Sequence, residues 1–208
     1  MVDVPLKIAL SKDLKLSDTP EPIKAELIRK LTIPNPKYLE NARMGRWNRN
    51  VPKVLRFFHR YKETLWVPRG YLRQLIIMCR QYQVSYQMED HRRKLPPVKF
   101  SFQGELKSFQ KRAVGKMLAK DFGTLNSPTG SGKTVMGLYM IAQRLQPALV
   151  VVHTKDLAYQ WIEQIKHFLG IPEPEIGLIG SGKKQIGDAI TVALVQSLYR
   201  CADVVSKQ

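Results

Sequence analysis

The segment SPTGSGKT, residues 127–134, constrains the fold more than any other part of the chain, because it lies between a predicted strand and a predicted helix. Glycine-rich loops at such a junction bind phosphate, since backbone N–H groups and the helix N-terminus point at the anion. Gly130 and Gly132 let the backbone wrap around it. Lys133 would neutralise phosphate charge, and the Thr134 hydroxyl would hold magnesium. The segment therefore predicts a nucleotide site with Mg²⁺ as cofactor.

The general form of this motif begins with glycine, whereas this chain has Ser127 in that place. A positive φ at that position would disfavour serine. The strand–loop–helix context still favours phosphate binding over a chance match. We predict two catalytic residues, Lys133 and Thr134, within an ATP-binding loop formed by Ser127, Pro128, Thr129, Gly130, Ser131, Gly132, Lys133 and Thr134. A second glycine-rich run, GSGKK at 180–184, lacks the spacing and is interpreted as a basic surface turn.

From residue 97 onward, predicted helices alternate with buried strands. The helices are 106–120, 134–145, 156–169 and one from Gln196, and the strands are 122–126, 148–153, 175–180 and 190–195. Such βαβ alternation is typical of a parallel, doubly wound sheet covered on both faces. The sequence thus predicts an α/β domain over residues 97–208.

The first 96 residues have a different pattern. Predicted elements are a strand at 6–10, a helix at 20–31, a loop at 33–50, a hairpin of strands 54–61 and 63–68, a helix at 70–83 and a strand at 84–88. The segment 91–99, HRRKLPPVK, reads as a linker because its Pro-Pro pair cannot continue a helix. We therefore expect a small α+β domain over 1–96.

The charge balance indicates a polyanionic partner. The chain has 34 Lys and Arg against 17 Asp and Glu, a net charge of +17. The segment from Lys37 to Arg80 contains eleven basic residues but only two acidic ones, Glu40 and Glu63. Such an excess suits nucleic acid or an acidic membrane surface. No apolar run is long enough to span a membrane, and the charged N-terminus is unlike a signal peptide, so we expect no membrane and the cytoplasm.

The run GRWNRN, residues 45–50, places Trp47 between Arg46 and Arg49 in this basic region. Basic residues interleaved with an aromatic suit backbone contacts combined with base stacking. We therefore predict that Arg46, Trp47 and Arg49 bind nucleic acid. For Trp47 itself, anchoring of the loop to the core is a slightly favoured alternative.

Four motifs in order resemble the first motor domain of superfamily 2 helicases, in the branch of the xeroderma pigmentosum group B helicase and the phage recombination helicase UvsW. They are LKSFQKRAV, SPTGSGKT, LVVVHTKDLAYQW and TVALVQSL. A small residue is common at the position of Ser127 in that family. His153 and Leu194 depart from its usual proline and threonine. The N-terminal segments NPKYLENARMGRWNRNVPKVLRFF and WVPRGYLRQLI are similar to the small domain that precedes the motor in UvsW-like proteins.

The resemblance implies a RecA-like P-loop motor domain with an incomplete parallel sheet, preceded by the α+β domain. It implies that the nucleotide is ATP and that Gln110 reads adenine, whereas from the residues alone Gln110 could equally be a solvated residue on its helix. It also implies nucleic-acid contacts by Thr154, Lys155, Gln196 and Ser197. Thr154 and Ser197 could equally be helix caps, because each stands at the start of a predicted helix.

The resemblance implies an ATP-dependent DNA helicase or translocase of the repair or recombination type, with DNA favoured over RNA. Such a motor needs an Asp-Glu pair and an arginine from a second motor domain. The sequence contains no DExH or DExD. We therefore expect the front portion of a longer helicase, inactive without its DExH segment and second motor domain. The alternatives are a motor subunit of a restriction system and a nucleic-acid-binding module without hydrolysis.

Overall fold

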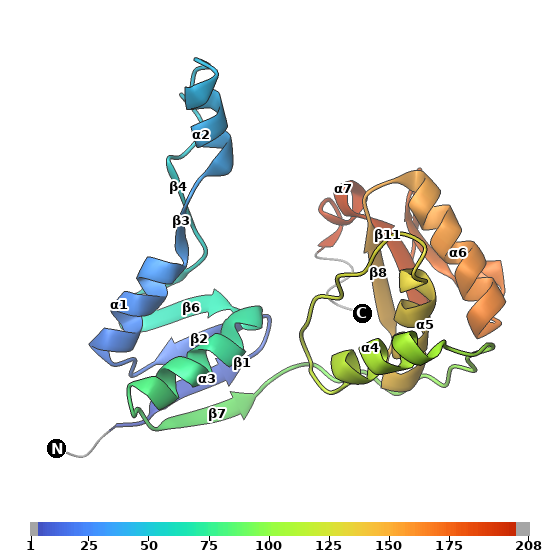
Figure 1. Ribbon diagram of the computed structural model, residues 1–208, viewed down its shortest axis with the longest axis horizontal. Coiled ribbons are helices and arrows are strands. Elements are labelled where there is room, and N and C mark those ends of the chain that lie inside the picture. The colour runs from blue at the N-terminus through green and yellow to red at the C-terminus, as the bar shows by residue number, and fades with distance from the viewer. Residues whose placement is uncertain (1–3, 203–208) are drawn as a thin grey trace. The chain divides into compact units, whose positions relative to one another are not determined.

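The computed structural model describes residues 4–202, and the chain divides into two compact units at Arg93 (Figure 1). This division lies inside the predicted linker. Each unit has a hydrophobic core of its own. Within the described residues, no helix is long and apolar enough to cross a membrane.

The first unit is built on a five-stranded sheet in the order β5-β6-β2-β1-β7. Its strands are β1 (Leu6–Leu10), β2 (Asp13–Ser17), β5 (His59–Tyr61), β6 (Thr64–Pro68) and β7 (Tyr86–Asp90). Only β1 and β7 pair in parallel. The helices α1 (Glu21–Lys30) and α3 (Leu72–Gln81), the latter preceded by the short helix η1 (Arg69–Tyr71), supply core residues against one face of this sheet. Alternate residues of β1, β2 and β6 are buried there, which is the pattern of an antiparallel sheet with one covered face, whereas all residues of the edge strands β5 and β7 are exposed.

The predicted hairpin is only partly correct. β5 and β6 do form a hairpin, with Lys62 at φ 51° in the turn. The predicted strand 54–61 is however divided, because β4 (Val54–Arg56) pairs with β3 (Thr32–Pro34) in a separate two-stranded sheet. Apolar alternation predicts that a segment is extended, but it cannot specify the strand with which it pairs.

The prediction of a loop over 33–50 is wrong. Residues 36–43 form the helix α2 (Pro36–Arg43). The Asn35 side chain caps it by accepting from the Lys37 N–H, and Pro36 occupies the first helical position, where its missing N–H costs nothing. These two start signals outweigh the turn-forming composition. We refer to β3, α2 and β4, residues 32–56, as the arm; in Figure 1 it extends away from the five-stranded sheet.

The second unit has a four-stranded sheet in the order β10-β9-β11-β8. Its strands are β8 (Ala148–Val152), β9 (Gly177–Gly180), β10 (Lys183–Gln185) and β11 (Ile190–Leu194). β8, β11 and β9 are parallel, as predicted, and β10 is an antiparallel edge strand. Its helices are α4 (Ser108–Leu118), α5 (Lys133–Arg144), α6 (Lys155–Leu169), η2 (Glu173–Glu175) and α7 (Val195–Leu198). The predicted α/β class is confirmed.

Two details of the second unit differ from expectation. Residues 122–126, which precede the glycine-rich loop, are not a strand, because no strand within 4–202 pairs with them. The sheet is also not fully covered on both faces. Side chains of α5 and α6 share a core with Val150 and Val152 of β8, whereas Leu149 and Val151 of that strand point to the opposite face and lie outside this core. Leu149 and Val151 of β8 therefore stay 43% and 47% exposed.

The run GSGKK forms a hairpin turn between β9 and β10. Ser181 and Gly182 have φ values of 52° and 82°, and Lys183 and Lys184 are exposed at the start of β10. The interpretation as a basic surface turn agrees with this geometry.

Candidate nucleotide-binding loop and nucleic-acid surfaces

The loop 127–134 has the backbone that its glycines predict. Gly130 and Gly132 have φ values of 77° and 78°, in the left-handed region that glycine tolerates best. Gly132 is the N-cap of α5, so Lys133 and Thr134 begin the helix. Ser127 does not have a positive φ, and its hydroxyl bonds that of Ser131 across the loop. Serine in the first position of the motif is therefore unstrained.

The Lys133 ammonium lies over the loop. Its Nζ donates to the Ser127 carbonyl at 2.9 Å and to the Pro128 carbonyl at 2.8 Å. Lys133 is exposed and Thr134 is half-buried. An ammonium group bound only by backbone carbonyls at the N-terminus of a twelve-residue helix suits an anion such as a phosphate chain. The loop is therefore the candidate site for the phosphates of a nucleotide.

Gln110 links α4 to this loop. Its side chain is only 7% exposed. Its Oε1 accepts from the Lys107 N–H at 2.9 Å, and its Nε2 donates to the Ser131 carbonyl at 2.9 Å. The alternative that Gln110 is merely a solvated residue is wrong. Each of its polar atoms keeps capacity for one further hydrogen bond, because an amide has two N–H groups and two lone pairs.

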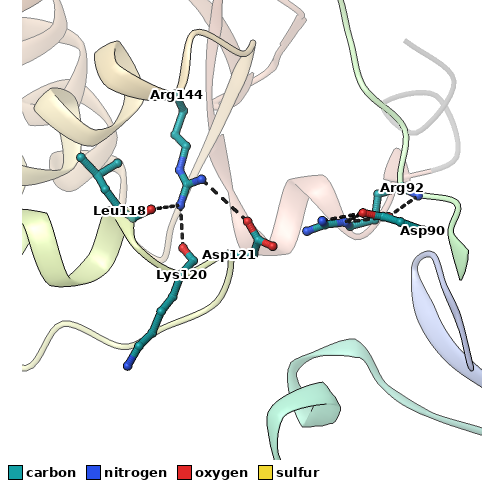
Figure 2. Close-up of polar contacts among 6 residues, drawn as sticks. All are labelled: Asp90, Arg92, Leu118, Lys120, Asp121 and Arg144. Atoms are coloured by element: carbon teal, nitrogen blue, oxygen red, sulfur yellow. Dashed lines mark hydrogen bonds and ion pairs between the residues drawn. The ribbon is translucent and has the colours of Figure 1, made fainter. Parts of the chain in front are cut away.

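Arg144, the last residue of α5, joins the same two helices at their other ends (Figure 2). Its Nη2 donates to the carbonyls of Leu118 and Lys120 at 3.1 Å and 2.6 Å, and Nη1 lies 3.7 Å from the Asp121 carboxylate. Leu118 ends α4 and Lys120 lies two residues beyond it, at the helix end where backbone carbonyls have no intrahelical donor. The arginine thus clamps α4 to α5. Sequence reasoning missed it, since nothing local links Arg144 to residue 118.

In the first unit, Figure 2 also draws Arg92 against Asp90 at the end of β7. Their charged groups approach to 2.7 Å. The residues that begin the predicted linker are therefore held by a local ion pair.

The four residues expected to contact a nucleic-acid backbone in the second unit gather at one edge of the sheet. β8 and β11 are paired in parallel up to Val152 and Leu194, so the residues that follow both strands lie side by side. The Gln196 Nε2 reaches the His153 carbonyl at 3.4 Å. Thr154 caps α6 by accepting from the Leu157 N–H at 3.3 Å. Lys155, Thr154 and Gln196 are exposed and Ser197 is half-buried.

Capping is therefore real for Thr154, but not for Ser197. The Ser197 side chain makes no cap hydrogen bond in α7, which begins two residues earlier at Val195. A hydroxyl that accepts from an N–H can still donate its own proton, so capping does not exclude a phosphate contact by Thr154.

The arm presents Trp47 to solvent. Trp47 is 84% exposed, so the alternative that it anchors the loop to the core is wrong. Asn48 orders this loop, because its Nδ2 donates to the Tyr38 carbonyl at 3.0 Å and its Oδ1 accepts from Asn41 at 3.0 Å. The Arg49 guanidinium lies 6.0 Å from the Trp47 ring centroid, at the limit for a cation–π contact.

The arm is also strongly basic. Six Lys or Arg residues accompany a single acidic residue, Glu40, between Thr32 and Arg56. None of the residues of α2 is buried. Within residues 4–202, neither Arg46 nor Arg49 forms an ion pair, so their charge is available to a partner. The described part of the chain contains no group of three metal-ligating side chains.

Comparison with known protein families assigns the second unit to a family. A sequence profile of the family described as type III restriction enzyme, res subunit, matches residues 103–208, more than half of the chain. The chain belongs to this family. The match covers α4, the glycine-rich loop and every strand of the second sheet.

Individual relatives agree with this family assignment. The DNA 3'-5' translocase XPB2 of Sulfurisphaera tokodaii is 35% identical over 99 residues, which are 48% of this chain and 22% of that protein. The crystal structure of the UvsW helicase from bacteriophage T4 superposes with a TM-score of 0.63 at 17% identity, covering 99% of this chain and 77% of that one. A second crystal structure of T4 UvsW gives the same score and covers 44% of that chain.

The expected resemblance to the superfamily 2 helicase branch of the xeroderma pigmentosum group B helicase and UvsW is thereby confirmed. The fold match extends over both units, including the α+β unit that the family profile does not reach. The chain spans 18% to 22% of the length of the curated relatives that it matches.

Proposed function

We propose that this chain is the nucleotide- and nucleic-acid-binding portion of an ATP-dependent DNA helicase or translocase that acts in repair or recombination. The observation that carries the proposal is the loop 127–134, whose two left-handed glycines precede Lys133 at the start of α5. XPB2 is named a DNA translocase, which favours DNA over RNA. ATP hydrolysis and unwinding are proposed for the whole protein.

Each residue of the loop has a role in nucleotide binding. The backbone N–H groups around Gly130 and Gly132 bind phosphate oxygens, and Lys133 exchanges its two carbonyl partners for them. Thr134 would hold Mg²⁺, which neutralises the charge of the phosphate oxygens when bound. Gln110 offers its remaining N–H and lone pair to an adenine edge. Because Gln110 also bonds the Ser131 carbonyl, one side chain would contact both the base and the phosphate loop.

Two surfaces are proposed for nucleic acid. At the carboxyl ends of β8 and β11, Thr154, Lys155, Gln196 and Ser197 supply hydroxyl, ammonium and amide donors for phosphate oxygens. In the arm, Arg46 and Arg49 contact phosphates while Trp47 stacks on a base. We propose a cytoplasmic location, because a motor that works on DNA and uses ATP needs a compartment that contains DNA and ATP.

A second candidate is the motor subunit of a restriction system. The description of the matching family, type III restriction enzyme, favours it. Both candidates use the same loop, and an associated nuclease or methyltransferase activity would distinguish the restriction motor. Assay of the purified parent for DNA cleavage beside unwinding separates them.

Isothermal titration calorimetry with ATP and ADP tests the nucleotide site. Lys133→Ala removes the loop's only side-chain cation but keeps its backbone cradle, so we expect nucleotide affinity to be lost. Lys183→Ala is the matched control, because Lys183 also follows a Gly-Ser-Gly run but lies in the β9–β10 turn. Equal affinities in the wild type and Lys133→Ala would place the nucleotide elsewhere.

A further inference from the structure

The five-stranded sheet of the first unit has one face without a helix. Helices α1 and α3 pack against the face that carries Leu6, Ile8 and the other buried strand residues. Side chains of the intervening strand positions point to the opposite face. No residue of that second face belongs to the core of this unit. A solvated sheet face is ordinarily polar, so aromatic side chains there call for an explanation.

The strand register places three aromatic rings on the uncovered face. His59 is paired with Trp66, and Tyr61 is paired with Thr64, in the β5–β6 hairpin. Cross-strand partners share a face, and Leu65 and Val67 on either side of Trp66 are buried in the core. The His59 and Trp66 rings are 5.5 Å apart, tilted by 45°. We call His59, Tyr61 and Trp66 the aromatic platform.

The platform is accessible within its unit. Tyr61 is 60% exposed, His59 is exposed and Trp66 is half-buried. The rings thus offer flat surfaces to a ligand from a rigid strand pair rather than from a flexible loop. Aromatic side chains on a sheet are a known way to stack two or three bases of a single strand.

Lysines surround the platform. Lys15 is the cross-strand partner of Trp66 on β2, is exposed, and forms no ion pair within residues 4–202. The Lys62 ammonium lies 5.5 Å from the Tyr61 ring centroid. The acidic residues near this face have partners of their own or lie away from the platform. Glu89 is on β7 at the far edge from β5 and bonds His91. Asp18, directly after β2, pairs with Lys7, and Glu63, next to Lys62, pairs with Lys24 of α1. Asp13 lies at the far end of β2, opposite Pro68.

We propose that this sheet face is a binding surface for single-stranded nucleic acid, with bases stacked on His59, Tyr61 and Trp66 and the backbone phosphates held by Lys15 and Lys62. Cations next to exposed rings match a ligand that combines negative charge with flat apolar bases. The proposal rests on nucleic acid as the substrate class proposed above, but it concerns a surface separate from the arm and from the ends of β8 and β11. It adds a single-strand site in the unit that does not carry the glycine-rich loop.

The test uses the whole chain and fluorescence anisotropy with a labelled oligothymidylate and a labelled blunt duplex. The double substitution His59→Ala and Tyr61→Ala removes two exposed rings but leaves the half-buried Trp66 in place. We expect it to weaken single-strand binding about tenfold or more and to leave duplex binding unchanged. Tyr61→Phe keeps the ring and should keep the affinity. Tyr82→Ala is the matched control, because Tyr82 is 46% exposed but follows α3, on the covered face.

Each other outcome overturns the proposal in a distinguishable way. Unchanged single-strand affinity with a lowered melting temperature would mean that the rings only stabilise the hairpin. If the wild type binds the duplex but not the single strand, the aromatic platform is not a single-strand site, while the proposed function still stands. If neither probe binds at low salt, both the single-strand site and the proposed nucleic-acid-binding function are refuted.

Discussion

Gly132 is required for two reasons: its backbone is left-handed, and the Gln110 side chain occupies the space where a Cβ would lie. Its φ is 78°, and a Cβ added there would collide with the Gln110 Nε2. We expect Gly132→Ala to cost about 1–2 kcal/mol for the left-handed backbone and to weaken ATP binding, because Gln110 must leave the loop. Gly115→Ala is the control: Gly115 lies inside α4 with open space around it, so alanine should raise stability by about 0.5–1 kcal/mol. Thermal unfolding and calorimetric titration measure both effects.

At the same scale, Glu26 makes part of the first unit's stability dependent on pH. Hydrogen bonds from Arg29 and then Lys30 lower the pKa of Glu26 from 4.5 to about 2. A lowered pKa in the folded state stabilises the protein above the unfolded pKa, and that contribution is lost as the pH falls towards the folded value. Glu26→Gln should therefore destabilise the chain at pH values above 4.5 and much less near pH 2.

Urea unfolding across that pH range measures the difference. Glu40→Gln is its control, because it removes a carboxylate from the exposed helix α2 without removing any ion pair of the described residues. A Glu26→Gln effect that stays constant with pH would contradict the assignment.

At the scale of elements, the helices α4 and α5 position the glycine-rich loop 127–134, the proposed nucleotide site. Gln110 joins them at the loop and Arg144 at the opposite end. We expect Arg144→Met to release two exposed carbonyls to water, at a cost of about 0.5–1.5 kcal/mol, and to weaken ATP binding by loosening α4. Differential scanning fluorimetry with and without ATP measures both. Arg112→Met is the control, because Arg112 is exposed on α4, and it should change neither stability nor ATP affinity. An equal effect of both substitutions would mean that only the lost charge matters.

On the scale of the whole molecule, the chain combines the proposed phosphate-binding loop in one unit with a basic arm in the other. Each arginine that neutralises a phosphate releases counterions, so the log–log salt slope should change by about 0.9 per lost contact. Arg46→Ala with Arg49→Ala should therefore flatten the slope of duplex binding. Arg73→Ala with Arg80→Ala removes the same charge from α3 and is the control. If both pairs flatten the slope equally, only net charge matters and the arm has no special role.

Most of the candidate nucleotide site follows from local sequence. Gly130 and Gly132 allow positive φ values, and Lys133 and Thr134 open a helix with apolar periodicity, so the loop needs only a few consecutive residues to be recognised. The elements with strong internal patterns, such as β8, α6 and β11, were likewise predictable. The missed helix α2 shows that local signals can also compete: its cap and first-turn proline were present in the sequence, beside residues typical of turns.

Only the tertiary structure decided which segments meet. Strand 54–61 is divided between two sheets, residues 122–126 have no described strand partner, and Arg144 reaches carbonyls more than twenty residues away. The platform of His59, Tyr61 and Trp66 likewise depends on cross-strand register. The physical reason is that φ preference, capping and side-chain periodicity act over a few residues. Strand pairing and face exposure depend on the partners that the rest of the chain brings into contact.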